Sequence, residues 1–455
     1  MDIISAIKTS KMRPYQYVIV FLCTFCSVID GYDLIVMGYV LPNLPAGFTT
    51  ADQKGYLISA GLIGMGVGAA ILAPLADKIG RRPLIIMGLT VTTSFVAATA
   101  LAPTAEAMMA VRFVTGMGVG AVMVSSIVLV QEFSPVSRRN FVIGVLGVGG
   151  PVGGMIAGFV GLSLTSTFSG AWQPLLWAGA GINVIGLVLV VFLLPESLSF
   201  LMSKRTPAAQ RKIEKIIARV GITGVDPSAP APSTGEAETG EGKQRLLGST
   251  LRERSILLWI AYGGFLAAFY FVNTWTPQLI SDASGDTQAG ALVGTILSIG
   301  QIGGSVLFGF VGLKVLATRI SWTALLVSVV SVVGFALLLG STGALVVVVV
   351  LGIAIYVGAA SFGAMAPGMY PPLARAKGYG MMLGMGRIGA IAAPIGAGYG
   401  LAVLAPTQLY LAASVPLLIS AICCFRIWQI TRDEFDRERA SARPEATSVV
   451  AELES

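Results

Sequence analysis

The chain has 455 residues, of which 55% are hydrophobic and only 12% charged, with a mean hydropathy of +0.81. A soluble globular protein carries roughly twice that charged fraction, so the composition excludes an ordinary soluble globular protein. The net charge of +7 is spread over loops rather than gathered in a basic domain, so we expect no nucleic-acid partner. The chain has no histidine, which excludes histidine metal sites and histidine proton relays.

Twelve apolar runs recur along the chain, each close to the roughly 20 residues that cross a bilayer as a helix. They predict an all-α membrane protein without a sizeable soluble domain. The expected spans are 15–40, 53–76, 83–102, 105–133, 139–164, 173–195, 255–280, 287–313, 318–340, 342–366, 377–403 and 407–430.

Basic residues mark one set of the loops between these spans. Lys8, Lys11 and Arg13 precede the first span, and Arg138 and Arg139 follow the fourth, whereas the opposite loops offer only Lys54. Cytoplasmic loops carry such an excess of lysine and arginine. We therefore expect a multi-pass protein of the cytoplasmic (inner) membrane with both termini in the cytoplasm.

Two aspartates, Asp30 and Asp33, lie inside the first span. A charge at the centre of a membrane helix costs about 2.5–3.5 kcal/mol on insertion scales. Their spacing places both on one side of the helix, where two ionised carboxylates repel and one retains a proton more readily. The pair predicts proton coupling; an ion pair inside the bundle or helix capping is the alternative.

A long polar segment divides the spans six and six. We predict an N-terminal six-helix bundle over 1–202, a cytoplasmic linker over 203–254, a C-terminal bundle over 255–431 and a disordered tail over 432–455. Residues 206–221 carry an apolar stripe opposite a basic face, which is typical of an interfacial helix. The Pro/Ser/Gly/Glu-rich stretch 226–242 is expected to be disordered.

The loop between the second and third spans reads Ala73-PLADKIGR-Arg82. It resembles the hallmark motif of the major facilitator superfamily, with Ala73 in place of its first glycine. The resemblance implies a gating latch, in which Asp77 at a helix end pairs with basic groups in one conformation only. An ordinary positive-inside loop is the alternative. The matching latch residues are Asp77, Lys78, Gly80, Arg81 and Arg82.

Further segments resemble the aromatic acid:H⁺ symporter family of that superfamily. They are Asp30-Gly-Tyr-Asp33, Arg112-FVTGMGVG-Ala121, Gln131-EFS-Pro135 followed by Arg138-Arg139, and Tyr370-PPLARAKGYGMMLGMGRIGA-Ile391. The resemblance implies twelve helices in two pseudo-symmetric six-helix bundles. It also implies import of a small aromatic carboxylate such as benzoate or a hydroxybenzoate with protons, as a monomer, with no cofactor other than the co-transported H⁺.

Arg387 and Arg112 are the two arginines expected well inside spans, away from the span ends. An arginine fork binds a carboxylate with two hydrogen bonds, so Arg387, near the middle of its span, is our first choice for the substrate. Arg112 is a second candidate, or the ion-pair partner of Asp30 or Asp33. Glu132 and Arg375 fall near span ends and are expected in gate contacts.

An aromatic substrate also needs an apolar pocket. Trp275, Tyr270, Phe362 and Tyr399 are the candidates, although each could instead serve packing or a membrane-interface belt. Asn273 and Gln301 are polar at membrane depth and could bind a ring hydroxyl, or could hydrogen-bond between helices.

Two other functions remain open. One is an exporter of drugs or metabolites against protons, since Gly150-Pro-Val-Gly-Gly154 loosely resembles an antiporter stretch, and the other is an importer of a different organic anion. A membrane enzyme or receptor is disfavoured because no catalytic constellation or phosphate loop is present.

Overall fold

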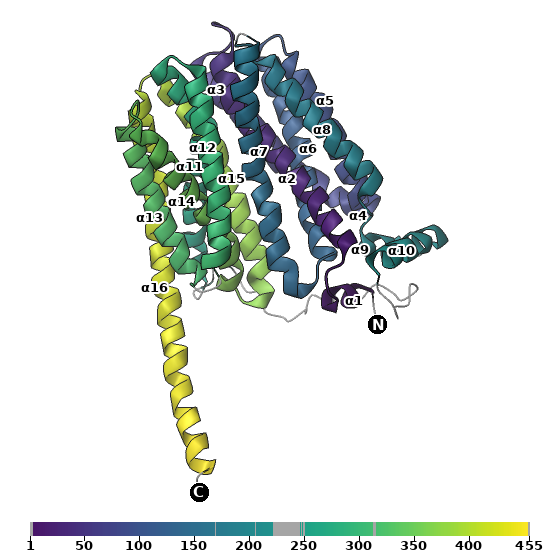
Figure 1. Ribbon diagram of the computed structural model, residues 1–455. Coiled ribbons are helices and arrows are strands. Elements are labelled where there is room, and N and C mark those ends of the chain that lie inside the picture. Colours follow the sequence, from purple (N-terminus) through teal and green to yellow (C-terminus); the bar gives the residue numbers. More distant parts are fainter. Residues whose placement is uncertain are drawn as a thin grey trace.

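The structure is a computed structural model that describes residues 3–168, 170–204, 206–221, 246, 248, 251–312 and 315–453, with side chains as far as 432. Long helices dominate the described residues, which contain no β-strand. The predicted disordered stretch 226–242 lies outside the described ranges. Both chain ends lie at the same end of the helical bundle, called the terminal side below (Figure 1).

The first half of the chain contains six long helical segments, the second of which bends through short π and 3₁₀ turns. They are α2 (Pro14–Val40), α3 (Ala51–Val67) with η2 (Gly68–Leu72), η3 (Ala73–Leu75) and α4 (Ala76–Ile79), α5 (Arg81–Ala100), α6 (Ala105–Glu132), α7 (Arg139–Thr167) and α8 (Gln173–Leu193). Shorter elements are α1 (Ile3–Thr9), η1 (Leu41–Asn43), η4 (Val136–Arg138), α9 (Leu198–Lys204) and α10 (Pro207–Val220).

The second half repeats this plan. Its long helices are α11 (Arg252–Ser284), α12 (Thr287–Val311), α13 (Ala317–Leu337), α14 (Gly343–Met365), α15 (Pro372–Leu401) and α16 (Pro406–Leu453), with η5 (Ala366–Met369) before α15. Twelve helical segments among the described residues are long and apolar enough to cross a membrane. This confirms the predicted all-α fold of twelve spans in two six-helix bundles, each starting and ending within a few residues of its expected limits.

The two halves are pseudo-symmetric in their packing. Within the first half α2 contacts α7 and α8, and α3 contacts α6; the equivalent pairs of the second half are α11 with α15 and α16, and α12 with α14. Between the halves, α3 packs on α15, α7 on α12 and α2 on α11. Each half therefore buries the same helix faces.

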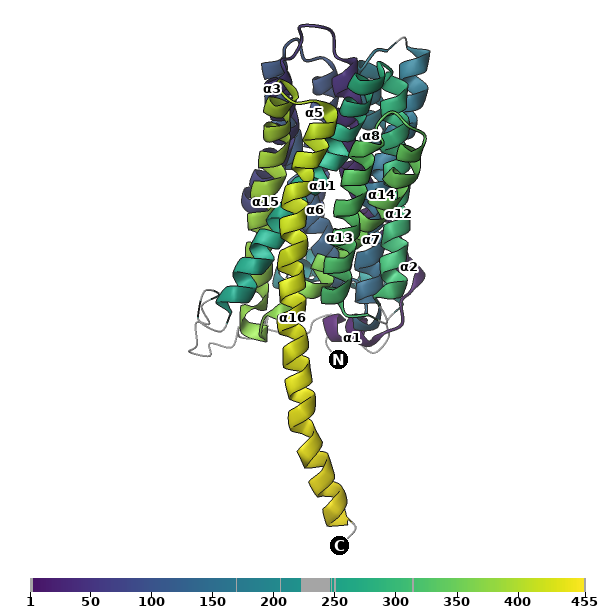
Figure 2. The same ribbon diagram turned by 90° about the vertical axis from the view of Figure 1, so that its left-hand side faces the viewer.

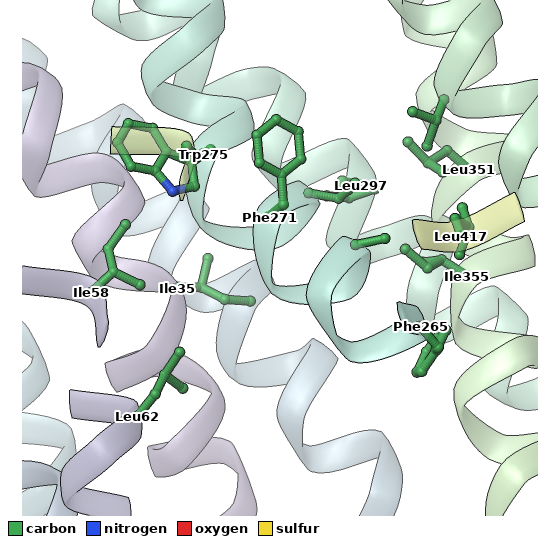
Figure 3. Packing of buried hydrophobic residues seen from close by; sticks show 14 of the residues in the cluster. Ile35, Ile58, Leu62, Phe265, Phe271, Trp275, Leu297, Leu351, Ile355 and Leu417 are labelled. Atoms are coloured by element: carbon green, nitrogen blue, oxygen red, sulfur yellow. The ribbon is translucent and has the colours of Figure 1, made fainter. Parts of the chain in front are cut away.

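One apolar core runs across the boundary between the halves. The cluster contains Ile35 of α2 and Ile58 of α3 together with Trp275 of α11, as Figure 3 shows. In the membrane this core gains little from the hydrophobic effect, so close packing must hold the halves together.

Close contacts between the halves gather away from the terminal side. A Cβ on Gly55 near the start of α3 would lie 2.5 Å from the carbonyl oxygen of Pro394, near the end of α15. Ser59 donates a hydrogen bond of 2.9 Å to the carbonyl of Ile391, and Tyr56 hydrogen-bonds to Tyr399. The halves are thus closed against each other at the end opposite the termini.

The polar segments differ in part from expectation. Residues of the predicted interfacial helix form α10, which runs across the bundle direction and projects from its edge (Figure 1); its apolar side packs on protein, and its interfacial role stays a prediction. The expected disordered tail is instead helical backbone, because α16 continues to Leu453 and extends far beyond the bundle (Figures 1 and 2). Glutamate, arginine and alanine are frequent between 434 and 445 and favour helix, which explains the continuation.

Candidate functional site

A single turn of α2, Asp30-Gly-Tyr-Asp33, points its residues in different directions. A Cβ on Gly31 would lie 2.1 Å from the carbonyl oxygen of Gly150, so only glycine permits this approach of α7. The hydroxyl of Tyr32 donates a 2.7 Å hydrogen bond to the carbonyl of Leu175 on α8. These two contacts fix the rotation of α2 and thereby orient both aspartates.

Asp33 is buried and ion-paired with Arg112 of α6. Nη1 of Arg112 lies 2.5 Å from Oδ1 of Asp33, and Nη2 donates a 3.0 Å hydrogen bond to the backbone carbonyl of Asp33. Arg112 is itself only 3% exposed. Of the two roles open to Arg112, the geometry favours the ion-pair partner over the substrate ligand, because its charge is already neutralised.

Asp30 is held differently from Asp33. Its Oδ1 is buried and finds no hydrogen-bond partner among the described residues. Asp30, Asp33 and Arg112 line one small cavity with room for about one water molecule. A second small cavity, between α2, α5 and α6, also touches Asp30. The two carboxylates therefore differ: Asp33 is ion-paired, whereas Asp30 has an oxygen without a partner beside a small cavity.

Arg387 of α15 lies within electrostatic range of Asp30 of the other half, yet no ion pair joins these two described residues. Nη1 of Arg387 is buried without a hydrogen-bond partner among the described residues, while Tyr270 of α11 lies close to the guanidinium. A buried guanidinium N–H without an acceptor can donate a hydrogen bond to a bound anion.

Tight packing of α15 on α11 positions Arg387. A Cβ on Gly386 would lie 2.4 Å from the ring of Tyr262, and one on Gly389 would lie 2.1 Å from the carbonyl of Gly263. Glycines on either side of Arg387 thus bring its backbone against α11, and the long side chain reaches toward the boundary between the halves.

Aromatic rings cluster beside Arg387. Ring centroids lie 5.2 Å apart for Tyr262 and Phe362, 5.7 Å for Phe265 and Phe269, and 5.7 Å for Phe269 and Tyr270. Tyr262 and Tyr270 are only partly buried, and both lie close to Arg387. Phe362 is fully buried behind Tyr262, so it supports this wall of the site and does not form its surface.

Two predicted aromatic residues lie away from Arg387. Tyr399 is 55% exposed, contacts Tyr56, and is twelve residues beyond Arg387 on α15, which is about 18 Å along a helix. Its position makes it part of the closure opposite the termini. Trp275 is fully buried in the shared core, one helical turn and more beyond Tyr270.

Asn273 and Gln301 hydrogen-bond to each other. Nε2 of Gln301 donates a 2.8 Å hydrogen bond to Oδ1 of Asn273, whose own amide donates to the carbonyl of Phe269. Both side chains are buried. The geometry therefore favours the helix–helix hydrogen bond, one of the two roles predicted for this pair.

The latch motif forms a tight turn at the terminal side. Gly80 has φ = 104°, and a Cβ there would lie 2.5 Å from Oε2 of Glu196. Oε1 of Glu196 accepts backbone hydrogen bonds from Arg81 (2.8 Å) and Arg82 (3.1 Å), so this carboxylate caps α5. Asp77 and Lys78 are exposed, and no described residue gives the Asp77 carboxylate a partner, so its latch role stays a prediction.

The two expected gate residues also lie at this end. Oε1 of Glu132 accepts a 2.5 Å hydrogen bond from the backbone N–H of Ser199, within the first half. Arg375 is exposed near the start of α15. Neither residue makes a hydrogen bond or ion pair between the halves among the residues that the structure describes. A hydrogen bond between the halves is made on the terminal side by the hydroxyl of Tyr356, which donates to the carbonyl of Gly147.

Sequence reasoning missed Tyr262 and Tyr356 as candidate site or gate residues. Tyr262 precedes Tyr270 by eight residues, a spacing that places both on one side of α11 and could have revealed them together. Tyr356 carries no such signal, because its partner is a backbone carbonyl of another helix.

Two bundles of six membrane-spanning helices with charged residues facing each other between them define the class of secondary transporters, not a class of enzymes. The sequence profile of the Major Facilitator Superfamily matches residues 20–361, and the chain belongs to that superfamily.

Curated relatives and solved structures agree with this assignment. The chain is 28% identical to a gallate transporter of Pseudomonas putida, over 86% of this chain and 87% of the relative, and 28% identical to the 4-hydroxybenzoate transporter PcaK of Acinetobacter baylyi, over 86% of each. A benzoate transport protein of Acinetobacter baylyi is 26% identical over 98% of this chain and 94% of its own length. The fold is similar to a partially occluded inward-open xylose transporter XylE of E. coli, with TM-score 0.69 and 15% identity over 90% of this chain and 99% of the other.

Proposed function

We propose that this protein imports a small aromatic carboxylate together with protons by alternating access. The observation that carries the proposal is the buried, unpartnered Nη1 of Arg387, which lies within electrostatic range of Asp30, a carboxylate of the other half whose Oδ1 is also unpartnered. The similarity to transporters of gallate, 4-hydroxybenzoate and benzoate supports the substrate class.

The substrate carboxylate binds Arg387. Its guanidinium offers an unused N–H, and the neighbouring Tyr270 hydroxyl can donate a second hydrogen bond. The aromatic ring packs against Tyr262, Phe269 and Tyr270 of α11; the edge-to-face arrangement of Phe269 and Tyr270 suits an inserted ring. Arg112 is an unsuitable ligand because Asp33 already occupies it.

Asp30 couples this binding to protons. When ionised, Asp30 neutralises part of the Arg387 charge and repels an incoming carboxylate. When protonated, it leaves the Arg387 charge to the substrate. Entry of one carboxylate therefore favours uptake of a proton at Asp30, which is the linkage that a symporter requires.

The protein acts in the cytoplasmic membrane with both termini in the cytoplasm, as the basic loops of the terminal side indicate. In that orientation the closed end of the structure faces outward. The only co-transported ion is H⁺, and a monomer contains every group the cycle needs.

Proteoliposomes test this proposal. An inward-directed proton gradient should drive accumulation of radiolabelled 4-hydroxybenzoate above its equilibrium level, and a protonophore should abolish the accumulation. Liposomes without protein correct for passive entry of the neutral acid. A competition panel of benzoate, hydroxybenzoates, gentisate and an aliphatic acid of similar size then defines the substrate.

The opposite direction would contradict symport. If the same gradient drives preloaded substrate out of the liposomes, the protein is an exporter that exchanges against protons. If only non-aromatic acids compete, it imports another organic anion and the ring-binding part of the proposal is wrong.

A further inference from the structure

Exposed basic side chains gather at the terminal side of the first half, on α1, the α1–α2 connection, α9 and α10. We call this surface the basic platform; it consists of Lys8, Lys11, Arg13, Lys204, Arg211, Lys212, Lys215 and Arg219, all exposed. Glu214 is the one acidic side chain among residues 3–17, 198–204 and 206–221, which the structure describes.

The platform is held in a fixed orientation. The apolar side of α10, with Ile213, Ile216 and Val220, is buried in a cluster that includes Ile3 and Ile7 of α1. The helix is capped by Thr206, whose side chain accepts from the backbone of Ala209, and ends at Gly221 in the left-handed conformation. Because its apolar face is occupied by protein, α10 presents a basic face outward.

The platform lies where α2 enters the apolar zone. The Arg219 guanidinium stacks over the ring of Tyr15, 5.5 Å from its centroid, and Tyr15 is the second residue of α2. On the same end of α2, Tyr17 is 49% and Phe21 57% exposed on the outer surface. Tyrosine at the first turns of a membrane helix marks the level of lipid headgroups, and α10 projects sideways from the bundle at this level (Figure 1).

We propose that the basic platform binds the headgroups of anionic phospholipids in the leaflet on the terminal side. Eight exposed cations, with Glu214 the one acidic side chain in the same segments, produce a positive surface that complements phosphate and glycerol-phosphate charge. The lateral projection of α10 places these cations over lipid beside the bundle. The lipid tails provide the second anchor that a free phosphate lacks.

Spin-labelled lipids measure this binding in the full-length protein. Phosphatidylglycerol and phosphatidylcholine with a nitroxide near the tail end are reconstituted with the protein, and the motionally restricted fraction of each gives their relative association. The test variant carries Arg211→Gln, Lys212→Gln and Lys215→Gln. The matched control removes the same charge from exposed terminal-side positions of the second half, with Arg252→Gln, Arg319→Gln and Lys377→Gln.

We expect the protein to prefer phosphatidylglycerol, and the preference to fall by about threefold or more in the test variant while the control retains most of it. High salt should reduce the preference. Equal loss in both variants, or an unchanged preference in the test variant, would overturn the proposal. Size-exclusion profiles and helical circular dichroism check that the variants fold, which is expected because the substituted side chains are exposed.

Discussion

The ion pair of Asp33 and Arg112 is the residue-scale feature with the largest expected effect on stability. Arg112→Met leaves a buried carboxylate without its partner, which should destabilise the protein by about 3–5 kcal/mol. Adding Asp33→Asn removes the uncompensated charge and should restore much of that loss. Thermal unfolding in detergent measures both; a double variant no more stable than the single one would show that Asp33 does not depend on this pairing.

Replacing Asp30 should abolish proton-driven accumulation of the substrate but preserve its binding. In Asp30→Asn no proton can be bound or released at this position, so gradient-driven accumulation should disappear while exchange of internal for external substrate persists. Asp52→Asn near the start of α3 is the control, because it makes the same change at a partly exposed carboxylate. Undiminished accumulation by Asp30→Asn would exclude Asp30 from coupling.

Arg387 should determine affinity for the carboxylate. Hydrogen bonds to charged groups contribute about 1.5–3 kcal/mol, so Arg387→Ala should raise the KM by about ten- to a hundredfold. Arg387→Lys keeps the charge but not the planar fork and should recover only part of the affinity. Initial uptake rates over a range of substrate concentrations provide the measurement, with the exposed Arg319→Ala as control. Unchanged kinetics would show that a residue other than Arg387 binds the substrate carboxylate.

At the scale of elements, closure of α3 on α15 depends on glycine. The Cβ of Gly55→Val would collide with the backbone at Pro394, which cannot shift like a flexible side chain. We expect this variant to lose transport because the end opposite the termini cannot close. Gly66→Val on the same helix is the matched control, because nothing lies within 4 Å of its added Cβ.

A cysteine at Ser59 reports the state of this closure. Ser59 is 1% exposed and donates to Ile391 across the boundary. With Ser59→Cys, a membrane-impermeant maleimide should react faster in the Gly55→Val background than in the Gly66→Val background. Equal, slow labelling in both would mean that α3 and α15 close despite the added side chain.

At the scale of the whole molecule, the two ends of the bundle should lie on opposite sides of the membrane. Lys8→Cys should resist an impermeant reagent in intact cells and react after permeabilisation, whereas Lys54→Cys should react in intact cells. The native cysteines at 23, 26, 423 and 424 are buried and should give little background. The reverse pattern would place both termini outside.

The amino-acid sequence by itself determined the membrane fold. Apolar runs of bilayer length must form helices, because helices satisfy their own backbone hydrogen bonds in lipid. These helices appear close to the predicted positions. The alternation of basic loops predicted their orientation in the membrane. The charged candidates Asp30, Asp33, Arg112 and Arg387 could also be found from the sequence, because ionisable residues at membrane depth are rare and need a reason. Helix in the tail was missed because charge was taken to outweigh helix propensity.

Only the tertiary structure decided which of these charges pair and which stay available. The spacing places Asp30 and Asp33 on one side of α2. The rotation of α2 against α7 and α8 pairs Asp33 with Arg112 and leaves Asp30 unpaired, within electrostatic range of Arg387. Likewise Tyr399 and Trp275 looked equivalent to Tyr270 along the chain, and packing between helices alone put Tyr270 beside Arg387. The reason is physical: helix geometry makes residues three and four positions apart neighbours on one helix, whereas contacts between helices depend on how two whole helix surfaces fit together.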